Sequence, residues 1–112
     1  MVLKLEQMKK IHSIINHYGH TTQFNKTVEE LAELTRALVR DDRNNVIEEI
    51  ADVYIMLEQL KIMGGISDDL INYVIDQKLN RTIERMEHED KKDNHKCVIA
   101  CKFFRTPGTS SK

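Results

Sequence analysis

The sequence has little of what breaks helices or crosses membranes. Its 112 residues include one proline, Pro107, and four glycines, so almost nothing interrupts a helix before the C-terminal end, and an all-α domain is the expected class. No apolar run approaches the roughly 20 residues that span a bilayer. Charged residues also interrupt the N-terminal stretch, so it lacks the continuous apolar segment of a signal peptide. We therefore expect a cytoplasmic protein with no membrane partner.

Cysteine is scarce, and basic residues are not in excess over acidic ones. Cys97 and Cys101 do not make a disulfide framework, and with His95 they form only a weak zinc pattern that lacks a fourth ligand. The net charge of -1 leaves no basic excess, so a nucleic acid polymer is not an expected partner. The length suits one domain, which we place at residues 1–88, followed by a charged and then apolar tail at residues 89–112.

Apolar periodicity predicts four helices. They cover residues 3–18, residues from Thr21 or Thr22 to 40, residues 46–63 and residues 68–86. Either threonine suits the N-cap of the second helix, and Asn45 with Glu48 resembles a capping box for the third. Ser67 is the expected cap of the fourth.

The second and third helices each carry a clear apolar stripe, which we expect to face the core. The stripes consist of Phe24, Val28, Leu31, Thr35 and Leu38, and of Val46, Ile50, Val53, Leu57 and Leu60. The third helix is also apolar on a second side, which a monomer of this size can scarcely bury. The sequence therefore predicts an oligomer that completes the core of a four-helix bundle.

Two pairs of acids stand three residues apart on these helices. Glu30 and Glu33 share one face of the second helix, and Glu49 and Asp52 share one face of the third. Four such acids on neighbouring helices would form a cage for a hard cation. The alternative is a solvated face on which Lys26 pairs with Glu30. Against that alternative, Glu49 and Asp52 border the apolar stripe, where half-buried carboxylates need a counter-charge.

The fourth helix carries basic residues near its apolar face. Lys78 projects close to the middle of that face, and Arg81 lies at its edge. A lysine in this position either extends to solvent or meets an anion, which would be a carboxylate or a phosphate.

These residues together form a pattern with a familiar order. The pattern is Gln23-x-x-Lys26-x-x-Glu29-Glu30-x-x-Glu33, then Glu48-Glu49-Ile-Ala-Asp52, then Lys78-Leu-x-Arg81, and it resembles the MazG family of nucleoside triphosphate pyrophosphohydrolases. The resemblance covers residues 5–86 and leaves the tail unmatched. It implies a four-helix all-α fold, assembled as a homodimer or homotetramer. It also implies magnesium-dependent hydrolysis of a nucleoside triphosphate to the monophosphate and pyrophosphate, often of damaged or non-standard nucleotides.

The resemblance also implies roles for individual residues. The magnesium ligands would be Glu30, Glu33, Glu49 and Asp52, and the substrate-binding residues would be Gln23, Lys26, Lys78 and Arg81. Glu29 or Glu33 would be the catalytic base. Oxygen ligands suit Mg²⁺, with Mn²⁺ as a substitute, and the lack of histidine among these positions argues against zinc.

Two other classes compete with this interpretation. A non-catalytic helical adaptor would use the apolar sides of the third helix to bind a partner, and its acids would form a solvated face. A dinuclear iron or manganese bundle would typically need Glu-x-x-His pairs, which the sequence lacks.

Overall fold

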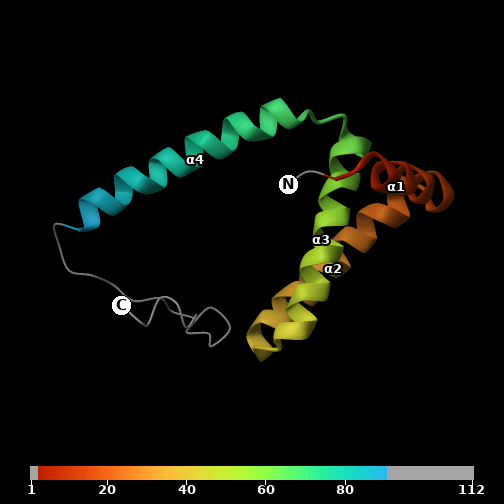
Figure 1. Ribbon diagram of the computed structural model, residues 1–112, viewed down its shortest axis with the longest axis horizontal. Coiled ribbons are helices and arrows are strands. Elements are labelled where there is room, and N and C mark those ends of the chain that lie inside the picture. Colours follow the sequence, from red (N-terminus) through yellow and green to blue (C-terminus); the bar gives the residue numbers. More distant parts are fainter. Residues whose placement is uncertain (1–2, 91–112) are drawn as a thin grey trace. The chain divides into compact units, whose positions relative to one another are not determined.

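The computed structural model describes residues 3–90, which form four α-helices and, within that range, no strand. The helices are α1 (Leu5–Tyr18), α2 (His20–Arg40), α3 (Arg43–Gly64) and α4 (Asp68–Glu89) (Figure 1). The predicted all-α class is confirmed. Helices α1 to α3 belong to one compact unit, and α4 belongs to a second.

Several predictions concern residues beyond that range. The weak zinc pattern of His95, Cys97 and Cys101 lies outside the described residues, as does nearly all of the predicted tail at residues 89–112. The fourth helix ends at Glu89, close to the predicted domain boundary.

A single glycine separates α1 from α2. Gly19 has φ 91° and ψ 160°, a backbone conformation that residues with a Cβ rarely adopt. Its N–H donates to the carbonyl of Ile15 at 2.8 Å, and its own carbonyl accepts from the N–H of Gln23 at 3.1 Å. Helix α2 therefore begins at His20 with no side-chain cap, and the predicted capping role of Thr21 or Thr22 is wrong.

A two-residue turn joins α2 to α3. Asp41 adopts the left-handed conformation with φ 58°, and the Asp42 carboxylate accepts a hydrogen bond from the N–H of Asn45 at 3.3 Å. Helix α3 thus begins three residues before the predicted start, and the predicted capping box of Asn45 and Glu48 is wrong. Asn45 lies inside the first turn of α3, and its backbone N–H is the group that the Asp42 carboxylate caps. The Ser67 cap of α4 is confirmed, since its hydroxyl accepts from the N–H of Leu70 at 3.2 Å.

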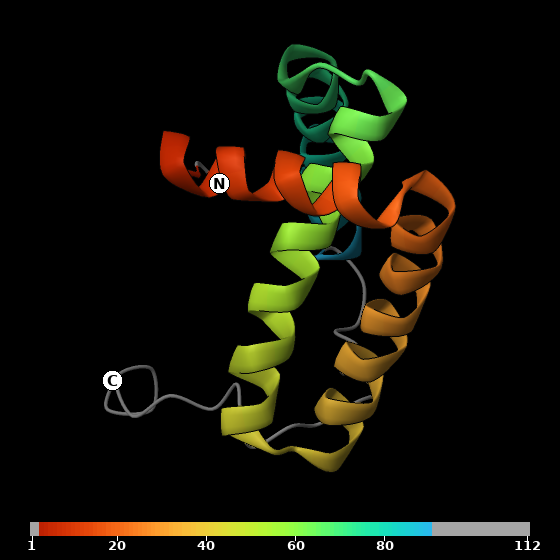
Figure 2. The same cartoon turned by 90° about the vertical axis from the view of Figure 1, so that its right-hand side faces the viewer.

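The core of the first unit lies where α2 runs antiparallel to α3 and α1 crosses them (Figure 2). Its buried apolar side chains come from all three helices: Ile11, Ile15, Ala37, Val46, Val53 and Met56. Four polar residues are equally buried, namely Gln23, Thr27, Glu58 and Gln59. This core is therefore part apolar and part polar.

The predicted core face of α2 is wrong for this unit. Phe24 and Val28 are both 56% exposed, and Leu31 is 44% exposed, whereas Gln23 and Thr27 on the other stripe are buried against α3. The predicted stripe of α3 is only partly buried, because Val46 and Val53 are covered but Ile50 and Leu57 are not. A helix with two candidate faces can turn only one toward a single neighbour.

The Asp42 cap provides a test of this fold. We expect Asp42→Ala to lower the free energy of unfolding by about 1 kcal/mol, because the Asn45 N–H loses its acceptor at the start of α3. Urea unfolding followed by circular dichroism measures the change. Asn44→Ala, on the same turn but exposed, is the matched control. Equal stability of the two variants would contradict the assigned cap.

Candidate functional site

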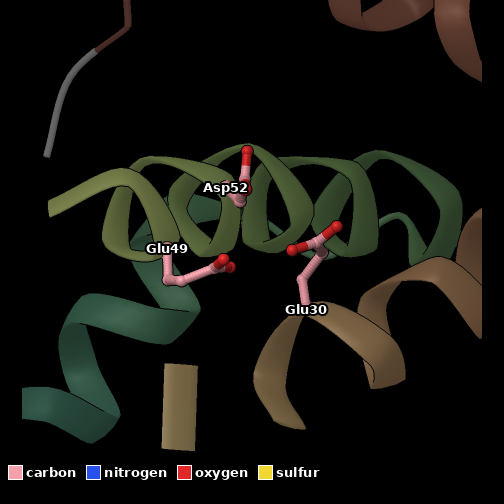
Figure 3. Close-up of side chains that lie close together, drawn as sticks. All are labelled: Glu30, Glu49 and Asp52. Carbon is pink, nitrogen blue, oxygen red and sulfur yellow. The ribbon is translucent and has the colours of Figure 1, made fainter. Parts of the chain in front are cut away.

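Three carboxylates meet where α2 packs against α3. Glu30 reaches from α2 toward Glu49 and Asp52 on α3 (Figure 3). Each side chain offers one oxygen, and these oxygens all lie within 4.8 Å of one another. The three-residue spacing of Glu49 and Asp52 places both on one helix face, and the antiparallel packing places Glu30 opposite them. We call these three residues the acidic cluster.

The acidic cluster is partly removed from water. Only 12% of the Glu30 side-chain surface is exposed, and Glu49 and Asp52 are half-buried. The Oε1 atom of Glu49 is buried and has no hydrogen-bond partner among the described residues. Burial, followed by the proximity of Glu30, raises the pKa of the Glu49 carboxyl. Burial and the negative charge of Glu30 also raise the pKa of Asp52.

One lysine partly offsets this negative charge. The Lys26 Nζ lies 3.1 Å from the Glu30 Oε2 and 3.9 Å from the Glu29 Oε1. Its interaction with Glu30 raises the pKa of Lys26, which keeps the ammonium charged. The half-exposed Lys26 is a single positive charge beside three carboxylates, so the acidic cluster still favours a further cation.

The donor set of the acidic cluster fits a magnesium ion. Around one octahedral Mg²⁺ with oxygens at about 2.1 Å, neighbouring oxygens lie about 3.0 Å apart and opposite ones about 4.2 Å apart, so these atoms would have to close by up to about 2 Å to bind one ion. Mg²⁺ commonly retains waters and takes only a few carboxylates from the protein. The Oε1 of Glu49, which has no hydrogen-bond partner among the described residues, is available as a ligand atom.

The remaining predicted site residues lie in different surroundings. The Glu33 Oε2 accepts from Arg36 at 2.7 Å, and Glu33 is not part of the acidic cluster. Glu29 is exposed, with 70% of its side-chain surface accessible. Gln23 is buried. Lys78 and Arg81 lie on α4, in the second unit.

A cavity of about 600 Å³ adjoins Lys26. Its walls come from all three helices of the first unit and are formed by Ile14, Tyr18, Thr22, Gln23, Asn25, Lys26, Glu29, Ile55, Met56 and Gln59. The volume lies within the range of small-molecule sites, roughly 300–1,000 Å³. Lys26 belongs to the cavity wall and also pairs with Glu30, so the cavity and the acidic cluster are neighbours.

Sequence reasoning missed Gln59, which lies beyond the acidic cluster on α3. The Gln23 Nε2 donates to the Gln59 Oε1 at 2.7 Å, and the Thr27 hydroxyl lies 3.5 Å from the Met56 sulfur. Asp52, Met56 and Gln59 follow at spacings of four and three residues, which is one continuous helix face. Extending the acidic face along α3 by two turns would have found Gln59.

A family comparison decides what kind of protein carries this site. The sequence profile described as Phosphoribosyl-ATP pyrophosphohydrolase matches residues 4–78, about two thirds of the chain. The chain belongs to this family. The phosphoribosyl-ATP pyrophosphohydrolase family shares the MazG-like all-α fold, which confirms the resemblance seen in the sequence. Comparison with curated proteins and with solved structures found no match.

The family match covers the whole acidic cluster and ends at Lys78, so that Arg81 lies beyond it. The family points to a hydrolase that acts on a nucleotide and is in general metal-dependent. Over residues 3–90, no helix is both long and apolar enough to cross a membrane.

The raised pKa of Asp52 predicts how stability depends on pH. Its folded-state value lies above the ordinary 3.8, so the folded state holds this proton more tightly than the unfolded chain does. The resulting stabilisation is present at low pH and is lost as the pH rises through the raised pKa. In metal-free buffer we therefore expect Asp52→Asn to raise the melting temperature by a few degrees at pH 7 and by less at pH 4.

Differential scanning calorimetry at both pH values measures this difference. Asp76→Asn, at an exposed position of α4 outside the acidic cluster, is the matched control for the loss of one carboxylate. A lower melting temperature for Asp52→Asn than for the native chain at pH 7 would contradict the assigned strain between the carboxylates.

Proposed function

We propose that the protein is a magnesium-dependent nucleoside triphosphate pyrophosphohydrolase that yields the monophosphate and pyrophosphate. The observation that carries this proposal is the acidic cluster of Glu30, Glu49 and Asp52, whose oxygens lie within 4.8 Å of one another. Membership of a pyrophosphohydrolase family supports the reaction class. Removal of non-standard nucleotides from the cytoplasmic pool is the proposed role.

The acidic cluster would hold the metal, and Lys26 would bind the substrate phosphates. A bound Mg²⁺ supplies positive charge to the phosphates and favours ionisation of the attacking water. Lys26 lies 3.1 Å from Glu30, so a phosphate near the cluster would also be within reach of the Lys26 ammonium. Mn²⁺, which accepts the same oxygen ligands, is the proposed substitute.

Two acids are candidates for the base that takes the proton of the attacking water. Glu29 is largely exposed and lines the cavity next to Lys26. Glu33 lies one turn further along α2 and is paired with Arg36, which it would have to leave in order to act as a base or as a fourth metal ligand. Comparison of Glu29→Gln with Glu33→Gln in rate assays distinguishes the two.

Lys78 and Arg81 complete the proposed substrate-binding set with Gln23. The two basic residues stand three apart on α4 and therefore share a helix face. A triphosphate carries several negative charges, which Lys26 alone cannot neutralise. We assign both basic side chains to phosphate binding on the resemblance of the Lys78-Leu-x-Arg81 motif.

Burial of the acids argues against the adaptor alternative. On a solvated adaptor face, Glu30 would be open to water, whereas only 12% of its side-chain surface is exposed. A partly buried cluster with raised pKa values for Glu49 and Asp52 is instead typical of a functional site.

The uncovered apolar stripe of α2 supports the proposed oligomer. Helices α1 to α3 leave Phe24, Val28 and Leu31 exposed on one side of the unit. Exposed apolar groups of this kind commonly mark protein interfaces. We propose that a second copy of the chain covers the stripe, in a homodimer or in a homotetramer built from such dimers.

Activity provides the first test. We expect pyrophosphate release from a nucleoside triphosphate to require Mg²⁺, and Glu30→Gln and Asp52→Asn each to lower the rate by more than the 10–100-fold typical of outer-sphere partners, because each loses a direct ligand. The assay measures pyrophosphate from phosphoribosyl-ATP and from standard and modified nucleoside triphosphates.

The controls separate loss of the metal site from loss of the fold. Circular dichroism should show unchanged helix content in both variants, and Asp76→Asn on α4 should retain native activity. Full activity of either cluster variant would rule out the assigned ligands. No release from any substrate, with no Mg²⁺-dependent rise in melting temperature, would favour the adaptor.

The oligomer has a separate test. We expect Leu31→Asp to convert the native assembly to a monomer, because a charge on the apolar stripe would be buried without a partner at the interface. Light scattering after size-exclusion chromatography measures the mass. Ser13→Asp, which adds the same charge to an exposed position of α1, should keep the native mass. A native chain that is already monomeric would contradict the proposed assembly.

A further inference from the structure

The cavity of the first unit has at its wall an amide group that lacks a partner. Gln59 lines the cavity and is completely buried, with 0% of its surface exposed. Its Oε1 accepts from the Gln23 Nε2 at 2.7 Å, while its own Nε2 has no hydrogen-bond partner within residues 3–90. A buried N–H without an acceptor is destabilising, and such groups are rare in native proteins. The Gln59 amide therefore needs an acceptor from elsewhere.

The rest of the cavity suits a flat heterocyclic ring. Ile14, Ile55 and Met56 supply apolar surface, and Tyr18 supplies an aromatic ring against which a base can stack. Lys26 links the cavity to the acidic cluster through its 3.1 Å contact with Glu30. A nucleotide with its base in the cavity would thus have its phosphates on the side of the acids.

We propose that Gln59 reads the base of the nucleotide by donating from its Nε2 to a ring carbonyl oxygen. This inference rests on the proposed function, because it takes the substrate to be a nucleotide. The polarity follows from the pair itself: the Gln59 Oε1 already accepts from Gln23, so the group left without a partner is the Nε2 donor, which needs an acceptor. An exocyclic amino group at the same place would bring two donors together. The pair therefore selects bases with an oxo group over those with an amino group.

A flexible side chain gives the base access to this amide. Gln59 lies beneath the cavity surface, and Met56, which lines the same cavity, stands one turn before it on α3. Methionine has several rotatable bonds and adapts readily to a ligand. A change of its rotamer opens the path to the Gln59 Nε2.

The experiment measures binding of nucleosides that have no phosphate, in the absence of divalent metal. Inosine is compared with adenosine and uridine with cytidine, since each pair differs by an oxo or an amino group at one carbon, together with the proton on the adjacent ring nitrogen of the oxo member. For the native chain we expect about 10-fold tighter binding of the oxo member, the value of roughly one hydrogen bond. Gln59→Met, of similar volume, should lower this ratio to about one.

The matched control is Gln77→Met, the same substitution at an exposed glutamine of α4, which should keep the native ratio. Titration of the ¹⁵N-labelled native protein gives a second readout, in which the side-chain amide signal of Gln59 should shift with inosine and not with adenosine. That readout decides the question even if Gln59→Met does not fold.

Several results would overturn the proposal. They are an absence of nucleoside binding to the native chain, equal or tighter binding of the amino members, and a native ratio retained by Gln59→Met. None of these measurements involves turnover or the acidic cluster. A protein that fails to release pyrophosphate but shows the oxo preference would therefore refute the proposed reaction and leave the base-reading role of Gln59 supported.

Discussion

The antiparallel packing of α2 on α3 is the constraint on which the rest of the structure depends. The turn at Asp41 and Asp42 reverses the chain within two residues, so that positions advancing along α2 meet positions receding along α3. Three contacts follow this rule: Gln23 meets Gln59, Thr27 meets Met56, and Glu30 meets Glu49 and Asp52. The acidic cluster and the amide pair are thus successive layers of one helix interface, fixed by the same turn.

This interface uses the polar stripe of α2, and its apolar stripe is left outside as a result. Burying Gln23 and Glu30 against α3 turns Phe24 and Val28 toward the opposite side of the helix. The unit loses apolar burial there and keeps half-buried carboxylates that repel one another. Both effects destabilise the isolated unit, as expected when a functional site is retained at the expense of stability. A cation at the cluster and a partner on the stripe would each offset one of them.

Sequence periodicity was sufficient for the helices but not for their orientation. The four helices, the Ser67 cap and the shared face of Glu49 and Asp52 follow from local spacing, and the described residues have all of them. That Glu30 joins this pair while Glu33 does not depends on how α2 packs against α3. Local spacing does not predict which face of α2 turns inward. Both stripes of α2 satisfy the helical period, and which of them is buried depends on the packing against α3. Gln59 stands on the same face of α3 as Asp52, but no local pattern marks its pairing with Gln23, which lies 36 residues away.

In the proposed oligomer, assembly and metal binding would be coupled. Most of the stability of a protein helix comes from the packing of its apolar face, so the exposed stripe of α2 would gain from a partner. Covering that stripe would also remove water from the helix that carries Glu30 and Lys26. Electrostatic interactions strengthen as the surrounding dielectric constant falls. A contact that covers the apolar stripe on one side of α2 would thus raise the cation affinity of the acidic cluster on the other side of the helix.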